Sequence, residues 1–134
     1  MKQIKRLAAL CFCSVILFAG CTKFGTAESE ITSYTYKDKH LTVHAKITNN
    51  HGCDYYMEQG FCFRQDTFPK LNDVFTTQVK VSDYTEVDSF STTLILPEVD
   101  TSYYVCAYVK NSAGLSYSKV EKVSTNPADY QNNE

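Results

Sequence analysis

Apolar residues recur at every second position along much of this chain, and that period constrains its fold more than any other feature. Between Leu41 and Ile47, leucine, valine, alanine and isoleucine alternate with threonine, histidine and lysine. Segments 90–96 and 103–109 alternate in the same way. Such alternation is typical of a strand that is buried on one face and solvated on the other. No segment carries a helical period, so the sequence predicts an all-β domain.

Turn residues divide this pattern into short strands. Asn49-Asn50-His51-Gly52 and Asn111-Ser112-Ala113-Gly114 are turn sequences, and Pro97 ends another run. Strands are expected at 31–36, 41–47, 60–64, 79–81, 90–96, 103–109 and 116–123. Seven strands over about 95 residues match an immunoglobulin-like sandwich, so we predict one such domain over residues 30–125.

The beginning of the chain has the layout of a secretory signal peptide. Its basic cluster consists of Lys2, Lys5 and Arg6. The apolar stretch that follows, from Leu7 to Ala19, is shorter than the about 20 residues that span a bilayer. We therefore expect residues 1–20 to be removed during export.

Phe18-Ala19-Gly20-Cys21 resembles the lipobox of bacterial lipoproteins. The resemblance implies that Cys21 becomes the first mature residue and carries a covalent lipid, typically palmitate, with no other cofactor. Two or more acyl chains anchor a protein stably, because each buried CH₂ contributes about 0.8 kcal/mol. Residues 21–29 would then form a lipidated tether and residues 126–134 a polar tail. Simple secretion and a retained leader are the alternatives.

The charge of the mature chain excludes one class of partner. Without the three basic residues of the leader, 10 of the 13 basic residues remain against 15 acidic ones, a balance of −5. An acidic domain without a basic stripe is a poor nucleic-acid binder, so the expected membrane contact is the lipid itself. We predict a cell-envelope protein in the outer membrane. Because Thr22-Lys23-Phe24 lacks an acidic run, the periplasmic leaflet is favoured over the surface.

Three segments resemble fibronectin type III-like domains, as found in lipoproteins of Gram-negative bacteria. Residues 103–117 (YYVCAYVKNSAGLSY) are similar to the signature Y-Y-V-R-A-Y-A-x-N-S-A-G-x-x-Y, and residues 58–63 (EQGFCF) are similar to the third strand. Residues 96–105 resemble the corner before the sixth strand. This implies that Tyr103 is the corner tyrosine, whose hydroxyl reaches back to the preceding loop. Cys106 departs from the family, which usually has arginine there.

The body of the domain contains three cysteines. Cys62 and Cys106 lie on the same face of two strands that are neighbours in this architecture. Cross-strand Cβ atoms lie about 4.5–5.5 Å apart, so we predict a disulfide that stabilises the fold by about 2–4 kcal/mol. The alternatives are pairing of Cys53 with either partner, and three free thiols.

The sequence carries no convincing catalytic or metal-binding constellation. On a strand, His40 and His44 are about 13 Å apart, too far for one metal ion. His51 and Cys53 supply too few ligands for zinc, and their spacing in a loop gives weak support for a nucleophile and its base. No metal is expected, and a thiol- or carboxylate-based enzyme is the least favoured function.

Exposed aromatic residues are the better indication of function. Tyrosine supplies a large contact area at low entropic cost, and loops of a sandwich often bind partners. The residues expected to contact a protein or a glycan are Tyr55, Tyr56, Met57, Arg64, Tyr104 and Tyr108. The predicted function is a membrane-anchored, non-enzymatic binding or adhesion module. The alternative is a structural envelope component that binds no free ligand.

Overall fold

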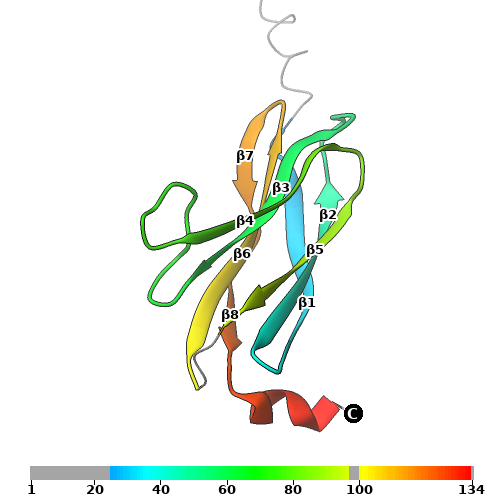
Figure 1. Ribbon diagram of the computed structural model, residues 1–134. Helices are drawn as coiled ribbons and strands as arrows, with labels where there is room; N and C mark the ends of the chain where they lie inside the picture. Colours follow the sequence, from blue (N-terminus) through cyan, green and yellow to red (C-terminus); the bar gives the residue numbers. More distant parts are fainter. Residues whose placement is uncertain (1–24, 97–99, 134) are drawn as a thin grey trace, which may run out of the picture.

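The computed structural model describes residues 25–96 and 100–133, which form a two-layered antiparallel β-sandwich (Figure 1). One sheet has the order β1 (Glu28–Lys37), β2 (His40–Asn49), β5 (Ser89–Ile95). The other has the order β4 (Thr77–Thr85), β3 (Tyr56–Arg64), β6 (Ser102–Asn111), β7 (Gly114–Tyr117). A further strand, β8 (Glu121–Ser124), pairs with β6, and a 3-10 helix, η1 (Pro127–Asn133), follows it. Among the described residues, no helix is long and apolar enough to cross a bilayer.

The predicted all-β sandwich is confirmed, but the last predicted strand is two strands. The break falls at Ser118, between β7 and β8. The Ser118 hydroxyl accepts a hydrogen bond from Ala107 N (2.9 Å), and Ser118 N donates to Ala107 O (2.9 Å). Because a side chain here takes the place of a backbone acceptor, the ladder is interrupted although the residue pattern continues.

Both ends of the domain extend beyond the predicted boundaries. β1 begins at Glu28, and Ala27 before it is already buried, so the fold starts earlier than residue 30. At the other end, η1 occupies the predicted polar tail. Its Tyr130 ring packs against Tyr34 and Tyr36, with ring centroids 6.3 and 6.4 Å away, and its hydroxyl donates to the backbone of β8.

The main core lies between the two sheets and has the predicted composition. Alternate residues of β2, β3 and β6 point inward, and the Phe61 and Phe90 rings meet across the core with centroids 5.1 Å apart. Burying each large apolar side chain stabilises the fold by about 1.5–3 kcal/mol. The core residues from these three strands are Leu41, Val43, Ala45, Ile47, Tyr56, Phe61, Phe63, Val105, Ala107 and Val109.

A second, smaller core lies on the outer face of β3 and β6, where a solvated polar face was expected. Cys62, Cys106 and Tyr108 are completely buried there and pack with Leu71 and Tyr117. The β3–β4 loop, residues 65–76, folds back over this face, and Leu71 N donates a hydrogen bond to the Tyr117 hydroxyl (3.1 Å). The prediction that these residues face solvent is therefore wrong, because alternation assigns a side but not what covers that side.

The start of the described chain and η1 lie at opposite ends of the sandwich (Figure 1). Gly25 is at the end that also carries the β2–β3 loop and the β6–β7 turn. The buried Asn111 side chain joins the three, since its Nδ2 donates to Gly25 O (2.8 Å) and to Asn50 Oδ1 (3.3 Å). The β3–β4 loop projects from the side of the sandwich.

Candidate functional site

Two of the tyrosines predicted to bind a partner are buried instead. Tyr56 is 3% exposed and its hydroxyl donates to Asp88. Tyr108 is fully buried under the β3–β4 loop, and its hydroxyl accepts a hydrogen bond from Gln78 Nε2 (3.0 Å). Burial is the largest cause that raises the pKa of both phenols above the usual value. Both residues support the fold, and neither is available to a partner.

The other predicted contact residues do not form one surface. Tyr104 is half-buried opposite Arg64 on β3, and Met57 is also half-buried. Tyr55, directly before β3, is 44% exposed, and its ring packs against Tyr84 of the edge strand β4, with centroids 6.1 Å apart. The structure therefore separates the Tyr55 side of the sandwich from the Arg64 side.

Arg64 is the centre of a polar cluster at the base of the β3–β4 loop. Its Nε lies 2.5 Å from Asp66 Oδ1, and its Nη1 lies 2.7 Å from Asp73 Oδ2. The guanidinium also lies beneath the Phe75 ring, 5.3 Å from the centroid. The hydrogen bond from Arg64 lowers the pKa of the Asp66 carboxyl, and the same bond raises the pKa of Arg64. The ion pairs of Arg64 with Asp66 and Asp73 therefore link the two ends of the loop.

The β3–β4 loop presents apolar side chains to solvent. Val74 is 93% exposed and Phe75 is 75% exposed, while Phe68 is partly exposed with its ring edge-on to Tyr117. These residues were not predicted as contact residues, because they lie outside any alternating run. A usable signal was present: two adjacent apolar residues between the polar neighbours Asp73 and Thr76 in a loop.

A cleft of about 450 Å³ adjoins this loop. Its lining combines three aromatic rings, an amide, a carboxylate, a guanidinium and a threonine hydroxyl: Phe63, Arg64, Gln65, Asp66, Phe75, Thr77 and Tyr103. The volume falls within the about 300–1,000 Å³ that is usual for binding sites. With the apolar loop beside it, this cleft forms the candidate recognition surface.

Tyr103 contributes to this surface. Its hydroxyl accepts a hydrogen bond from Gln65 Nε2 (3.0 Å), which links the start of β6 to the β3–β4 loop. The corner that the tyrosine was expected to reach includes residues 97–99, which lie outside the described residues.

Cys62 and Cys106 are directly opposite each other in the β3–β6 ladder, as predicted, but they are free thiols in this structure. The Cys106 thiol hydrogen-bonds to Cys62. This bond, together with burial, raises the pKa of Cys106, and the same bond lowers the pKa of Cys62. Cys53 is half-buried, and its sulfur lies 3.3 Å from Ser112 Oγ. The disulfide stays a prediction.

The described residues offer no metal centre. Across residues 25–96 and 100–133, no three histidine, cysteine or carboxylate side chains are close enough to hold an ion. His51 lies 3.7 Å from the Glu28 carboxylate rather than against Cys53. Cys21 lies outside the described residues.

No family model matches this chain, and no curated protein matches it. Its fold is nevertheless similar to solved structures. One of them, titled "Myokine structure", is 16% identical, with a TM-score of 0.50, over 74% of this chain and 98% of the other. At that identity the likeness shows the fold alone: an all-β sandwich of the fibronectin type III or immunoglobulin-like class.

Proposed function

We propose that this chain is a lipid-anchored, non-enzymatic module of the cell envelope that binds a protein partner through its β3–β4 loop. The observation that carries the proposal is the exposure of Val74 and Phe75 on a loop that Arg64 holds in place. Apolar side chains as exposed as these are typical of interaction sites, because a partner that covers them removes their surface from water, which is favourable.

The loop is also ordered before binding, which favours affinity. The Arg64 ion pairs fix its two ends, and Leu71 inserts into the second core. A preorganised loop loses less conformational entropy when a partner binds than a free loop does. Aromatic and arginine side chains such as Phe75 and Arg64 are typical of the residues that dominate binding energy.

The proposed anchor leaves this loop accessible. Three residues separate Cys21 from Gly25, so Cys21 lies at most about 14 Å from Gly25. The bilayer would then face the end of the sandwich that carries Gly25. The β3–β4 loop projects from the side, where a periplasmic protein can approach it (Figure 1).

Photo-crosslinking in cells tests the recognition surface. A photoreactive phenylalanine analogue at position 75 should give one discrete adduct, identified by mass spectrometry, and Val74→Ser should weaken that adduct. The matched control places the analogue at Val87, which is 60% exposed at a distance from the loop. The same adducts at both positions, or none at position 75, would contradict the assignment.

A separate experiment tests the anchor. Wild-type protein should partition into the detergent phase, and Cys21→Ala should move to the aqueous phase because it lacks the acyl chains. A Cys21→Ala variant that still partitions with membranes would refute lipidation at this residue, whatever the crosslinking experiment shows.

A further inference from the structure

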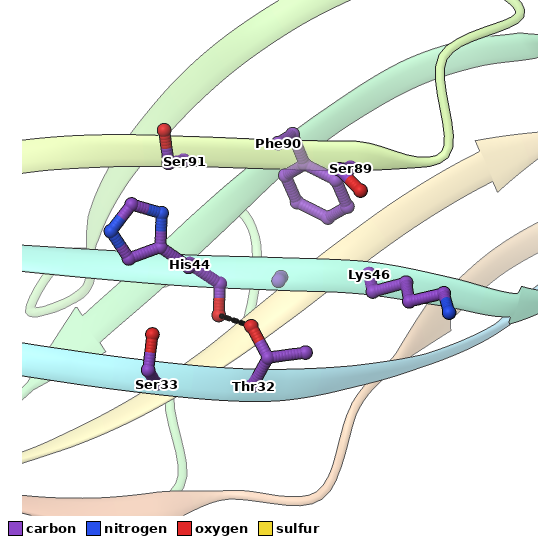
Figure 2. Close-up of a pocket in the computed structure, with 8 residues that line it drawn as sticks. Thr32, Ser33, His44, Lys46, Ser89, Phe90 and Ser91 are labelled. Carbon is purple, nitrogen blue, oxygen red and sulfur yellow. Dashed lines mark hydrogen bonds between the residues drawn. The ribbon is translucent and has the colours of Figure 1, made fainter.

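The outer face of the β1-β2-β5 sheet has a shallow hollow that belongs neither to the anchor nor to the β3–β4 loop. Its volume is about 460 Å³, and it lies over the middle strand β2 (Figure 2). All three strands contribute polar side chains to it: Thr32, Ser33, His44, Lys46, Ser89 and Ser91.

A bulge in β1 helps to form the hollow. The register passes from Ile31 opposite Ala45 to Ser33 opposite His44, which leaves Thr32 as an extra residue. An extra residue bends the strand and increases its local twist. The Thr32 hydroxyl donates to His44 O (3.2 Å), so the bulge is held in place (Figure 2). Short serine side chains on both sides keep the surface recessed.

The polar groups of the hollow are arranged in rows and are free. His44 lies between Ser33 and Ser91 in one row, and Lys46 lies beside Ser89 in the next (Figure 2). All five side chains are exposed, and none of them hydrogen-bonds or ion-pairs with another residue in the described part of the chain. Their donors and acceptors are available to an external ligand.

The charge of this face differs from that of the whole protein. Its outward residues include two lysines, Lys37 and Lys46, and two carboxylates, Glu28 and Glu30, with His40 and His44 between the lysines. The mature chain as a whole has a balance of −5. The formal charges of this face therefore balance, and an anion meets less repulsion here than the average over the acidic molecule.

We propose that the hollow binds an acidic saccharide. Serine hydroxyls and an imidazole each donate and accept hydrogen bonds, as the hydroxyls of a sugar do. Lys46 supplies the positive charge for a carboxylate or sulfate on the sugar. Neighbouring strands lie about 4.8 Å apart and successive outward residues about 6.8 Å apart, so the rows contact several units of a chain. An acidic polypeptide has no comparable set of hydroxyls to meet them.

Biolayer interferometry on the immobilised mature protein, at low ionic strength, tests this proposal. The probes are polygalacturonate, dextran sulfate, neutral dextran and poly-L-glutamate. Polygalacturonate and dextran sulfate should both bind, because the proposed site takes a carboxylate or a sulfate on the sugar. Neutral dextran should not bind, and poly-L-glutamate should bind at least fivefold more weakly than polygalacturonate.

Charge-matched variants locate the site. Lys46→Gln should weaken polygalacturonate binding at least fivefold, whereas Glu30→Gln should strengthen it, because Glu30 lies directly opposite Lys46. Lys122→Gln, at an exposed lysine of the other sheet, makes the same charge change and should have little effect. Equal losses for Lys46→Gln and Lys122→Gln, or equal binding of poly-L-glutamate, would overturn the proposal. These outcomes do not depend on the anchor or on the β3–β4 loop.

Discussion

Gly60 lies opposite Tyr108 in the β3–β6 ladder, at a point where no side chain fits. A Cβ at this position would lie 2.3 Å from Val79 O and 2.6 Å from the Tyr108 ring. Gly60→Ala should therefore displace β4 or the Tyr108 ring and destabilise the domain by at least about 1–3 kcal/mol. Urea unfolding measures the change. Thr35→Ala, on an exposed strand face, is the control and should be nearly neutral, and equal stability of both variants would contradict this role of Gly60.

The burial of Tyr130 should make the stability of the fold depend on pH in the alkaline range. Burial raises the pKa of Tyr130 to about 12, above the about 10 of an unfolded chain. The folded state therefore favours the neutral phenol, and this contribution is complete below pH 10 and is lost as the pH rises toward 12. The thermal midpoint should fall over this range, and Tyr130→Phe should reduce the slope. Tyr55→Phe, at an exposed ring, should keep the wild-type slope, and identical slopes for all three proteins would be inconsistent with the prediction.

At the scale of residues, the sequence pattern predicted which side chains share the outer face of β3 and β6, but not that the β3–β4 loop covers this face. Alternation placed Cys62, Cys106 and Tyr108 together on one face of β3 and β6, and the structure confirms this. The alternation predicted that this face is solvated, because the pattern within a strand does not indicate where a neighbouring loop lies. Gly60 in the middle of an otherwise bulky strand was the available signal, since such a glycine marks a close approach.

Among the elements, the β3–β6 ladder determines whether the two buried cysteines can join. The backbone of Ala107 bonds to Ser118, away from β3, so Cys106 and Cys62 form a hydrogen-bonded pair with Cα atoms about 5.5 Å apart. That Cα spacing is within the range of disulfides, and the Cβ atoms must approach from about 4.5–5.5 Å to about 3.5–4.5 Å for the bond to form. We expect exported protein, denatured without reductant, to be alkylated at Cys53 alone and at all three cysteines after reduction. Alkylation of all three without reductant would show that no bond forms.

The β6–β7 turn also holds the start of the domain in place, through the side chain of Asn111. Its amide holds Gly25 O, and its Oδ1 accepts hydrogen bonds from Ala113 N (3.0 Å) and Gly114 N (3.2 Å). Asn111→Ala should cost about 1–3 kcal/mol, because buried polar groups lose their partners. Amide exchange at residues 26–27 should also accelerate. Leu115→Ala, at an exposed residue of the same hairpin, should leave that exchange unchanged, and protection that survives Asn111→Ala would contradict the link.

Element boundaries were predictable where a pattern ended in a turn residue and unpredictable where a tertiary contact decided them. β2 ends at Asn49 and β6 ends at Asn111, each at the start of a predicted turn sequence. The break at Ser118 depends on a side chain that replaces a backbone group of β6. The position of η1 depends on the packing of Tyr130 against Tyr34 and Tyr36 of β1. Neither this packing nor the Ser118 hydrogen bond produces a periodic pattern in the sequence.

On the scale of the whole molecule, the candidate surfaces lie on different parts of the sandwich. The β3–β4 loop exposes apolar side chains and is held by ion pairs, while the hollow on the other sheet is polar and contains one lysine, Lys46. The sequence predicted a binding module but placed its contacts on Tyr56 and Tyr108, which the fold buries. The two surfaces are chemically unlike and are therefore suited to different ligands.

The position of the chain's start fixes how an anchored domain would face the bilayer. Asn111 ties Gly25 to the β6–β7 turn, and Cys21 lies at most about 14 Å beyond Gly25. Ala113, in that turn, should therefore lie near the lipid headgroups, whereas Ala128, in η1 at the opposite end, should not (Figure 1). This expectation rests on lipidation of Cys21.

Fluorescence quenching by headgroup-labelled lipids measures this orientation. Lipidated protein in the Cys53→Ser background is reconstituted in vesicles and labelled at Ala113→Cys or Ala128→Cys, both of which are exposed positions. The probe at position 113 should be quenched at least threefold more than the probe at position 128. Similar quenching at both positions would mean that the domain tumbles freely or lies on its side, and the β2–β3 loop would then be open to partners. A failure of lipidation is distinguishable, because unlipidated protein would not co-sediment with the vesicles at all.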